Sequence, residues 1–454
     1  MVKRPSPSSS SPSSRRGRLL DADRLASHPM AAADNTTGRF LVLLQPGATD
    51  SASKSLHERA GFRVATLAGA EGGDGIGGVD EGHGIVFQDL GVAVVNAAPD
   101  RLTALSDAVA SSSALQSFEP ERYVYAIGGF DLNYLRGYRD GVNAIYDRCT
   151  EQHGMHDSAS STHNDVQLSW GLIATRAGIS RFSGMGIKVA VLDTGLDLAH
   201  PDFVGRTIES RSFVDGQNVQ DGNGHGTHCC GIVAGKRDPL RLPRFGVASG
   251  VDLHVGKVLD DSGQGTDANI IAGIQWALSR ECSIISMSLG SPVAPGQRYS
   301  PAFQQIARRA LERGSVIVVA SGNDSDRRRD ILAPVSHPAN CPSMIAVAAV
   351  DRRLVPAAFS NAGDAASGSK IDLAGPGVDV VSAWPTPSLY KSLDGTSMAT
   401  PHVAGVAALH AESDGALRGR ALLAELVQRA RPLSASNEDV GAGLVQAPSA
   451  DPIS

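Results

Sequence analysis

Apolar runs alternate with amphipathic segments through the second half of the chain. Apolar runs occur at Ile187–Leu192, which Lys188 alone interrupts, and at Ile284–Ile285, Val316–Val319 and Met344–Val350. Between and after them, apolar residues recur at helical spacing in Asp267–Arg280, Ala302–Arg313 and Thr396–His410. Fully apolar strands that alternate with amphipathic helices are typical of a mostly parallel sheet with helices on both faces. The pattern therefore predicts a doubly wound α/β domain over residues 166–454.

A smaller unit is expected before this domain, over residues 38–127. Strands are predicted at Phe40–Leu44, twice within His83–Asn96, and at Tyr123–Tyr125, and helices at Ser51–Ala60 and Pro99–Ala110. The resulting order, β-α-β-β-α-β, is that of a ferredoxin-like layer of helices on an antiparallel sheet. We therefore expect a small α+β domain here.

Two polar segments flank the small unit. Residues 1–37 form a Ser/Pro/Arg-rich tail in which Ser6–Ser14 contains only serine and proline. Such a composition cannot bury enough apolar surface to offset its ordering entropy, so we expect disorder. Residues 128–165 are polar with weak periodicity and are predicted to be a linker.

Composition and charge exclude several classes of protein. The chain of 454 residues carries 41 basic and 47 acidic residues, a net charge of 41 − 47 = −6, which gives no electrostatic footprint for nucleic acid. Nucleic acid is therefore not an expected partner. A membrane is not expected either, because no apolar window is long enough to span a bilayer. The tail lacks the apolar stretch of a secretory signal, which favours an intracellular location.

Three polar segments follow or open apolar elements of the predicted α/β domain, where ligand sites of such sheets lie. They contain Asp193 in Asp193–Gly195, His225 in Asp221–His228, and Ser397 in Asp394–His402. Taken alone, Asp193 has the structural interpretation of a turn aspartate and Ser397 that of a helix cap. His225 and His228 lie three residues apart without the glutamate of an H-E-x-x-H zinc site, which argues against a metal pair. Pro401 is expected to be tolerable only in the first turn of a helix, which predicts a helix start near Ser397.

Together the three segments place Asp, His and Ser in one chain order. The gaps are 225 − 193 = 32 and 397 − 225 = 172 residues. This order is that of subtilisin, whereas chymotrypsin-like enzymes and α/β-hydrolases use other orders. The motifs Asp193-Thr194-Gly195, His225-Gly226-Thr227-His228 and Gly395–His402 resemble the three signatures of subtilisin-like serine proteases, over about residues 166–450. The resemblance implies a triad of Asp193, His225 and Ser397 that hydrolyses peptide bonds through an acyl-enzyme.

The same resemblance implies further site residues. Asn323, after the strand ending at Ala320, matches the residue that donates to the oxyanion together with the Ser397 N–H. Two segments would flank an extended peptide, and a third would form one wall of the pocket for the residue before the cut. The implied substrate-binding residues are Gly263, Gln264 and Gly265; Ser288, Leu289 and Gly290; and Ala320, Ser321 and Gly322.

Cofactor and partner expectations also follow from the resemblance. No catalytic cofactor is implied. Asp202 matches a calcium ligand of the family, but the loop at Lys236–Arg241 lacks the family's other ligands, so no metal site is assigned. Residues 38–127 resemble the family's inhibitory propeptide, which implies an autoprocessed zymogen with its own propeptide as intramolecular inhibitor. The cleavage point is left open within about residues 125–170.

Two other functions stay open from the residues alone. The chain could be a catalytically silent, peptide-binding member of the same fold, or an acyl hydrolase such as an esterase. All four reactive positions are filled, which argues against the first, and an extended peptide cleft argues against the second. We expect protein or peptide substrates and a monomer. Localisation stays undecided, because relatives with propeptides are often secreted.

Overall fold

The computed structural model describes residues 18–19, 35–67, 79–98, 101–127, 168–239 and 242–448. The predicted linker lies outside the described residues. So does most of the predicted tail, except for Arg18–Leu19, which form strand β1 beside Ile331–Leu332 (β14), and for residues from Asn35 onward. Within the described residues, no helix is both long enough and apolar enough to cross a membrane.

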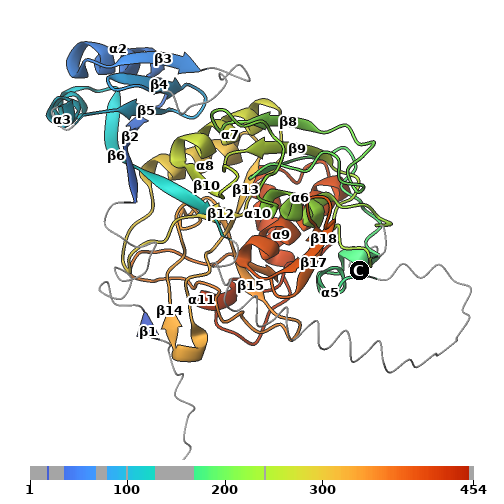
Figure 1. Cartoon of the computed structure of the whole chain (residues 1–454). Helices are drawn as coiled ribbons and strands as arrows, with labels where there is room; N and C mark the ends of the chain where they lie inside the picture. Colours follow the sequence, from blue (N-terminus) through green and yellow to red (C-terminus); the bar gives the residue numbers. More distant parts are fainter. Residues whose placement is uncertain are drawn as a thin grey trace, which may run out of the picture.

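A seven-stranded sheet forms the centre of the larger unit (Figure 1). Its order is β16-β15-β13-β11-β7-β9-β8, and all neighbouring pairs are parallel. The strands are β7 (Lys188–Asp193), β8 (Glu209–Ser212), β9 (Asp252–Lys257), β11 (Ile284–Met287), β13 (Val316–Ala320), β15 (Ile345–Val350) and β16 (Leu373–Pro376). Later strands add to either side of β7, so the carboxyl end of β7 lies at the topological switch point where sites of open α/β sheets form.

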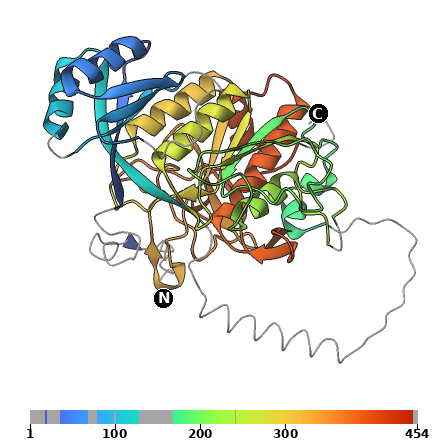
Figure 2. The same cartoon turned by 45° about the horizontal axis from the view of Figure 1, so that its top comes forward.

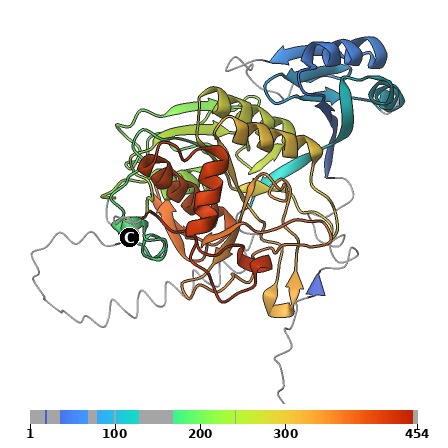
Figure 3. The ribbon, with the colours of Figure 1, turned by 180° about the vertical axis from the view of Figure 1, so that it is seen from behind.

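Alternate residues of the strands supply two cores, one on each face of the sheet. Val189 and Val191 belong to the core shared with α6 (His225–Ala234), α9 (Thr396–Ser413) and α10 (Gly419–Arg429). Ala190 and Leu192 belong to the core shared with α7 (Asp267–Ser279) and α8 (Pro301–Glu312). Figure 3 shows α9 and α10 in front of the sheet. The doubly wound α/β fold predicted from the apolar pattern is confirmed.

The smaller N-terminal unit is a sheet with two helices on one face. Its elements are β2 (Thr36–Leu44), α2 (Thr49–Ala60), β3 (Arg63–Leu67), β4 (His83–Phe87), β5 (Val92–Asn96), α3 (Arg101–Ser111) and β6 (Leu115–Ala126). The strand order is β6-β2-β5-β4-β3, with β3 parallel to β4. Strand β3 was not expected from the sequence: it lies at the edge, and its largely exposed side chains give no apolar run. The expected boundary at residue 38 falls inside β2.

The second face of this N-terminal sheet lies against the larger unit. Leu41, Phe87 and Val94 share one core with α7 and α8, whereas Val42, Val86 and Val95 pack under α2 and α3. Figure 2 shows the blue sheet beside the yellow and orange helices α7 and α8. The two units are therefore joined by an apolar interface.

Strand β6 continues from the N-terminal sheet into the larger unit. Its first half pairs with β2, and its last residues pair antiparallel with β10 (Gln264–Thr266) and β12 (Leu289–Gly290). The remaining elements are α5 (Trp170–Ala174), the 3₁₀ turns Ala177–Ile179 and Arg327–Arg329, β17 (Val380–Ala383), β18 (Tyr390–Leu393) and α11 (Asn437–Val440). The path of β6 fixes what occupies the candidate site.

Candidate active site

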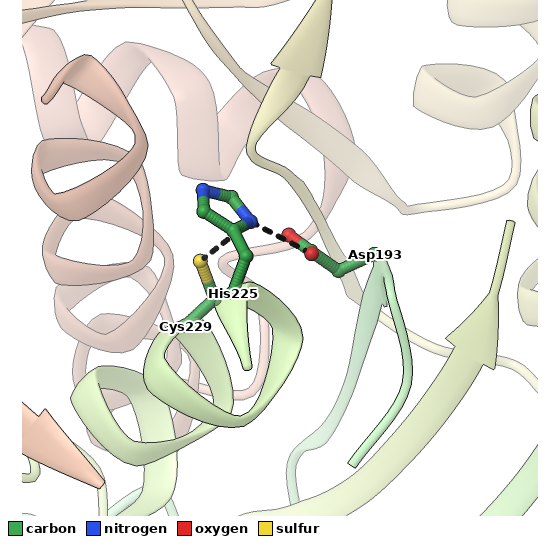
Figure 4. Close-up of side chains that lie close together, drawn as sticks. All are labelled: Asp193, His225 and Cys229. Atoms are coloured by element: carbon green, nitrogen blue, oxygen red, sulfur yellow. Dashed lines mark hydrogen bonds and ion pairs between the residues drawn. The ribbon is translucent and has the colours of Figure 1, made fainter. Parts of the chain in front are cut away.

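Asp193 and His225 meet at the carboxyl end of β7. Asp193 is the last residue of that strand, and His225 is the first residue of α6. The imidazole Nδ1 lies 2.8 Å from Asp193 Oδ1 (Figure 4), and both side chains are buried. Because Nδ1–H donates to the carboxylate, the lone pair of the neutral ring lies on Nε2. Nε2 has no hydrogen-bond partner among the described residues, so it is available to accept a proton.

Asp221 holds the loop that leads into α6. Its Oδ1 accepts hydrogen bonds from Thr194 Oγ1 at 2.9 Å and from the Gly224 N–H at 2.8 Å. Its Oδ2 accepts from the N–H and the hydroxyl of Thr227, at 2.8 and 2.7 Å. A carboxylate at a helix N-terminus satisfies otherwise unpaired N–H groups and opposes the positive end of the helix dipole. Sequence reasoning gave Asp221 no role, although its place four residues before His225 is a capping signal.

Two opposing effects set the pKa of His225. Burial favours the neutral ring, while the negative charge of Asp193 and its hydrogen bond favour the imidazolium, with a smaller contribution from Cys229. The Asp193 and Cys229 contributions exceed the burial effect and raise the pKa of His225 well above its ordinary value. Cys229 Sγ lies 3.9 Å from Nδ1, and burial raises the pKa of this thiol to about 11.

Ser397 lies in the first turn of α9, one residue after the helix begins. Its carbonyl oxygen accepts hydrogen bonds from Cys229 Sγ and from Ser288 Oγ, the latter at 2.8 Å. The carbonyl is free for these donors because the residue four positions on, Pro401, has no N–H. The predicted helix start near Ser397 is thus met to within a residue, but Pro401 lies in the second turn rather than the first.

The Ser397 hydroxyl points at the end of β6 rather than at His225. Oγ donates a short hydrogen bond to the Ile127 carbonyl oxygen and lies 3.2 Å from the Ser288 carbonyl oxygen. Cys229 contacts both the His225 ring and the Ser397 carbonyl, so one cysteine side chain links the imidazole to the serine. The structure therefore brings Asp193, His225 and Ser397 together, although they are up to 204 residues apart (397 − 193).

Asn323 follows β13 and faces the same carbonyl. Its Nδ2 donates to the Ile127 oxygen at 3.1 Å, while its Oδ1 accepts from the N–H and the hydroxyl of Thr396 at 3.0 and 2.9 Å. The contacts to Thr396 orient the amide so that its donors point into the cleft. A Cβ on Gly395 would lie only 3.3 Å from the Ile127 oxygen, and the φ of Gly395, +156°, disfavours any other residue.

The two predicted substrate segments lie on either side of β6. Tyr123–Tyr125 pair with β10, which contains Gln264 and Gly265, and the Ala126 N–H donates to the Gly263 carbonyl at 2.8 Å. On the other side, Ala126 and Tyr125 pair with Leu289 and Gly290, and the Ile127 N–H donates to the Ser288 carbonyl at 3.1 Å. An extended segment is therefore held by main-chain hydrogen bonds on both edges, a recognition mode that leaves side chains free for pockets.

The Ile127 side chain enters a recess beside Gly290. A Cβ on Gly290 would collide with Ile127 Cδ1 and approach Ser336, so the absence of a side chain at residue 290 makes the recess. Ala320 and Ser321 are buried, and Gly322, which lacks room for a side chain, leads into Asn323. The predicted wall Ala320–Gly322 thus lies directly before the amide that faces Ile127. Ser336 was missed from sequence, since nothing in its neighbourhood resembles a motif.

Asp202 lies away from this cleft. Its Oδ1 accepts from the Tyr390 hydroxyl at 3.2 Å, Oδ2 has no partner among the described residues, and burial raises the pKa of the carboxyl. The nearby Lys236 ammonium donates to the Pro201 carbonyl at 2.6 Å. Calcium requires six to eight oxygen ligands. A single unpaired carboxylate oxygen beside an ammonium group does not fit that requirement.

Known proteins are similar to this chain over the larger unit, which contains the candidate site. The subtilase family model matches residues 184–443, more than half of the chain. "Alkaline protease" from Alkalihalobacillus alcalophilus is 37% identical over 300 residues, covering 65% of this chain and 73% of that protein. "Subtilisin Savinase" from Lederbergia lenta is 38% identical over 287 residues, covering 62% and 98%. "Subtilisin E" from Bacillus subtilis is 40% identical over 261 residues, covering 57% and 63%.

A solved structure is also similar to this chain. The crystal structure of a cold-adapted subtilisin-like serine proteinase is 31% identical, with a TM-score of 0.50, and covers 62% of this chain and 97% of that chain. The chain therefore belongs to the subtilase family. It is a serine endopeptidase that acts on proteins.

Proposed function

We propose that Asp193, His225 and Ser397 form the catalytic triad of this endopeptidase and that residues 38–127 are its inhibitory propeptide. One observation carries the proposal. The carbonyl of Ile127, the last described residue after β6, accepts hydrogen bonds from both Ser397 Oγ and Asn323 Nδ2. A carbonyl held by a nucleophile and an amide donor is in the position of a bond to be cut.

The chemistry proceeds through an acyl-enzyme. His225 Nε2 accepts the proton of Ser397 Oγ as the oxygen attacks the carbonyl carbon, and Asp193 holds the ring in the tautomer that this transfer needs. His225 then protonates the leaving amine, and water hydrolyses the ester by the same route. A rotation of the Ser397 side chain from the Ile127 oxygen toward Nε2 is required, as expected where catalytic hydrogen bonds form only in the reactive complex.

Asn323 and the Ser397 N–H are proposed to stabilise the tetrahedral intermediate. Charge develops on the oxygen that Asn323 Nδ2 already contacts, so the donor needs no reorganisation during the reaction. The N–H of Ser397 lies in the first turn of α9, where the helix dipole also favours negative charge.

The N-terminal unit has the contacts of an inhibitor. Glu119 accepts from Ser300 Oγ and from the Ala302 N–H at the start of α8, and the buried Glu121 accepts from the Ala268 N–H at the start of α7. Carboxylates placed on two helix N-termini add electrostatic attraction to the apolar interface. Strand β6 then blocks the cleft.

Cleavage after Ile127 is the autoprocessing step that we propose. The bond between Ile127 and Gly128 follows the carbonyl that Ser397 contacts, which narrows the open range of about 125–170 to one position. Residues 128–165 would then form the start of the processed chain.

The function is tested by casein hydrolysis with the wild type and with Ser397→Ala. We expect the wild type to cleave casein and the variant to lose at least about 10⁴-fold in rate, because the nucleophile is removed. Retained cleavage by the variant would mean that another residue is the nucleophile. The exposed serine variant Ser388→Ala is the control and should behave as wild type.

We further propose that Asp202 does not bind calcium. The expected outcome is that a chelator changes the melting temperature of the wild type and of Asp202→Asn equally. A chelator effect that is confined to the wild type would place a calcium ion on Asp202.

A further inference from the structure

Lys257 is the last residue of β9 and carries a buried ammonium group. It is not one of the residues described above as lining the cleft. Its side chain is fully buried, and its ammonium donates to the Thr194 carbonyl at 2.6 Å and to Asp261 Oδ1 at 2.8 Å. Removing an ammonium from water costs several kcal/mol, which good hydrogen-bond geometry only partly repays. A fully buried lysine in this position is therefore a costly way to stabilise a strand end.

The first partner of Lys257 connects it to Asp193. In the register of the sheet, Lys257 lies opposite Asp193, and its ammonium binds the carbonyl of the next residue, Thr194. The two residues after Lys257 donate their N–H groups to the Asp193 carbonyl, at 2.9 and 3.1 Å. The end of β7 is thus held from β9 by one side chain and two backbone N–H groups.

The second partner connects it to the loop before His225. Asp261 Oδ1, which accepts from Lys257, also accepts from the Gly222 N–H at 3.2 Å, and the Asp261 carbonyl accepts from Asn223 Nδ2 at 3.2 Å. Asn223 Oδ1 in turn accepts from the His225 N–H. The hydrogen bond from Lys257 lowers the pKa of Asp261, in keeping with a charged carboxylate whose side chain is half exposed.

We propose that Lys257 is a positioning residue for the reaction: its ammonium fixes the Asp193–Thr194 strand end and, through Asp261, the Gly222–Asn223 loop in the arrangement that aligns Asp193 with His225. This inference rests on the catalytic roles proposed above. Neither Lys257 nor Asp261 belongs to a motif of the chain.

Loss of the Lys257 ammonium should affect turnover but not substrate binding. The turn before β10 is held by Asp260, whose Oδ1 accepts from the N–H groups of Ser262 and Gln264, without help from Lys257. The cleft strands should therefore keep their register when the ammonium is lost. Misalignment of the imidazole by about 1 Å can cost about 10²-fold in rate.

Three variants of the full-length chain test the proposal: Lys257→Met, which keeps an unbranched chain without the ammonium, Asp261→Asn, and the control Lys188→Met at the opposite end of β7. Their kcat and KM are measured on a peptide substrate, per active site titrated with a covalent serine reagent. We expect kcat to fall about 10- to 100-fold for Lys257→Met and about 3- to 10-fold for Asp261→Asn, with KM within about 3-fold. Lys188→Met should stay within about 2-fold of wild type.

The outcomes separate this inference from the proposed function. Unchanged kcat in Asp261→Asn and in any folded Lys257→Met overturns the positioning role, as does a loss that appears in KM rather than kcat. Asp261→Asn decides alone if Lys257→Met does not fold, because the half-exposed Asp261 is a safe site for an isosteric change. An inactive wild type, or an active Ser397→Ala, would instead refute the proposed function.

Discussion

At the scale of single residues, the account depends on atoms that are buried yet lack a partner. His225 Nε2 and Asp193 Oδ2 are both buried without a hydrogen bond among the described residues. Buried polar atoms are almost always paired, so each exception calls for an explanation, and a catalytic role is one of them. For His225 the free atom is the base that the proposed mechanism requires.

The oxyanion role of Asn323 gives the first prediction. Asn323→Ala should lower kcat by about 10²–10³, the loss known for the corresponding change in subtilisin itself, and change KM little. Steady-state kinetics on a peptide substrate measure both constants. The exposed Asn218→Ala serves as the control, and an equal loss in the two variants would contradict the assignment.

The pH dependence of His225 gives the second prediction. Activity needs the neutral ring, and Asp193 raises the pKa of His225, so activity is lost as pH falls through that raised value. Asp193→Asn removes the charge, which should lower kcat by roughly 10⁴-fold and move the acid limb of kcat/KM to lower pH. A profile that moves to higher pH would contradict the electrostatic role of Asp193.

At the scale of elements, helix α9 contains a buried histidine, His402, whose protonation affects the stability of the fold. His402 is buried, with Nδ1–H donating to the Met398 carbonyl at 2.8 Å, and burial lowers its pKa to about 4. The unfolded chain binds a proton near pH 6.5, whereas the folded chain does not until about pH 4. The stability from this group is therefore complete above about pH 6.5 and falls as the pH drops toward 4.

This linkage predicts a pH-dependent difference between the wild type and His402→Gln. The wild type should lose roughly 2–3 kcal/mol more of its unfolding free energy between pH 7 and 4.5 than the variant does. Urea unfolding in the inactive Ser397→Ala background avoids self-digestion during the measurement. The exposed His57→Gln is the control, and a difference between wild type and His402→Gln that is independent of pH would refute the linkage.

Sequence patterns at this scale predict elements well and contacts between elements poorly. Strands β7, β11, β13 and β15 follow from apolar runs, because both faces of a central parallel strand are buried. Strands β8, β9 and β16 of the same sheet were not predicted. The exposed edge strand Arg63–Leu67 has no such run and was missed. The role proposed for Lys257 was also beyond prediction, because only the sheet register brings the Thr194 carbonyl to the ammonium that also binds Asp261.

At the scale of the whole molecule, the long strand β6 connects the two units and explains how the N-terminal unit is placed beside the larger one (Figure 1). Strand β6 begins beside β2 and ends between β10 and β12. The sequence predicted the catalytic domain and its triad candidates from motifs, but left the cut within about 45 residues. The position of Ile127 in the cleft depends on the register of β6, which no local pattern specifies.

The most direct measurement is the intact mass and N-terminal sequence of the chains recovered from wild type and from Ser397→Ala. The account predicts that the wild type yields a chain beginning at Gly128 together with a fragment ending at Ile127, whereas Ser397→Ala remains uncut. A variant processed at the same bond, or an active wild type that keeps the Ile127–Gly128 bond intact, would contradict it.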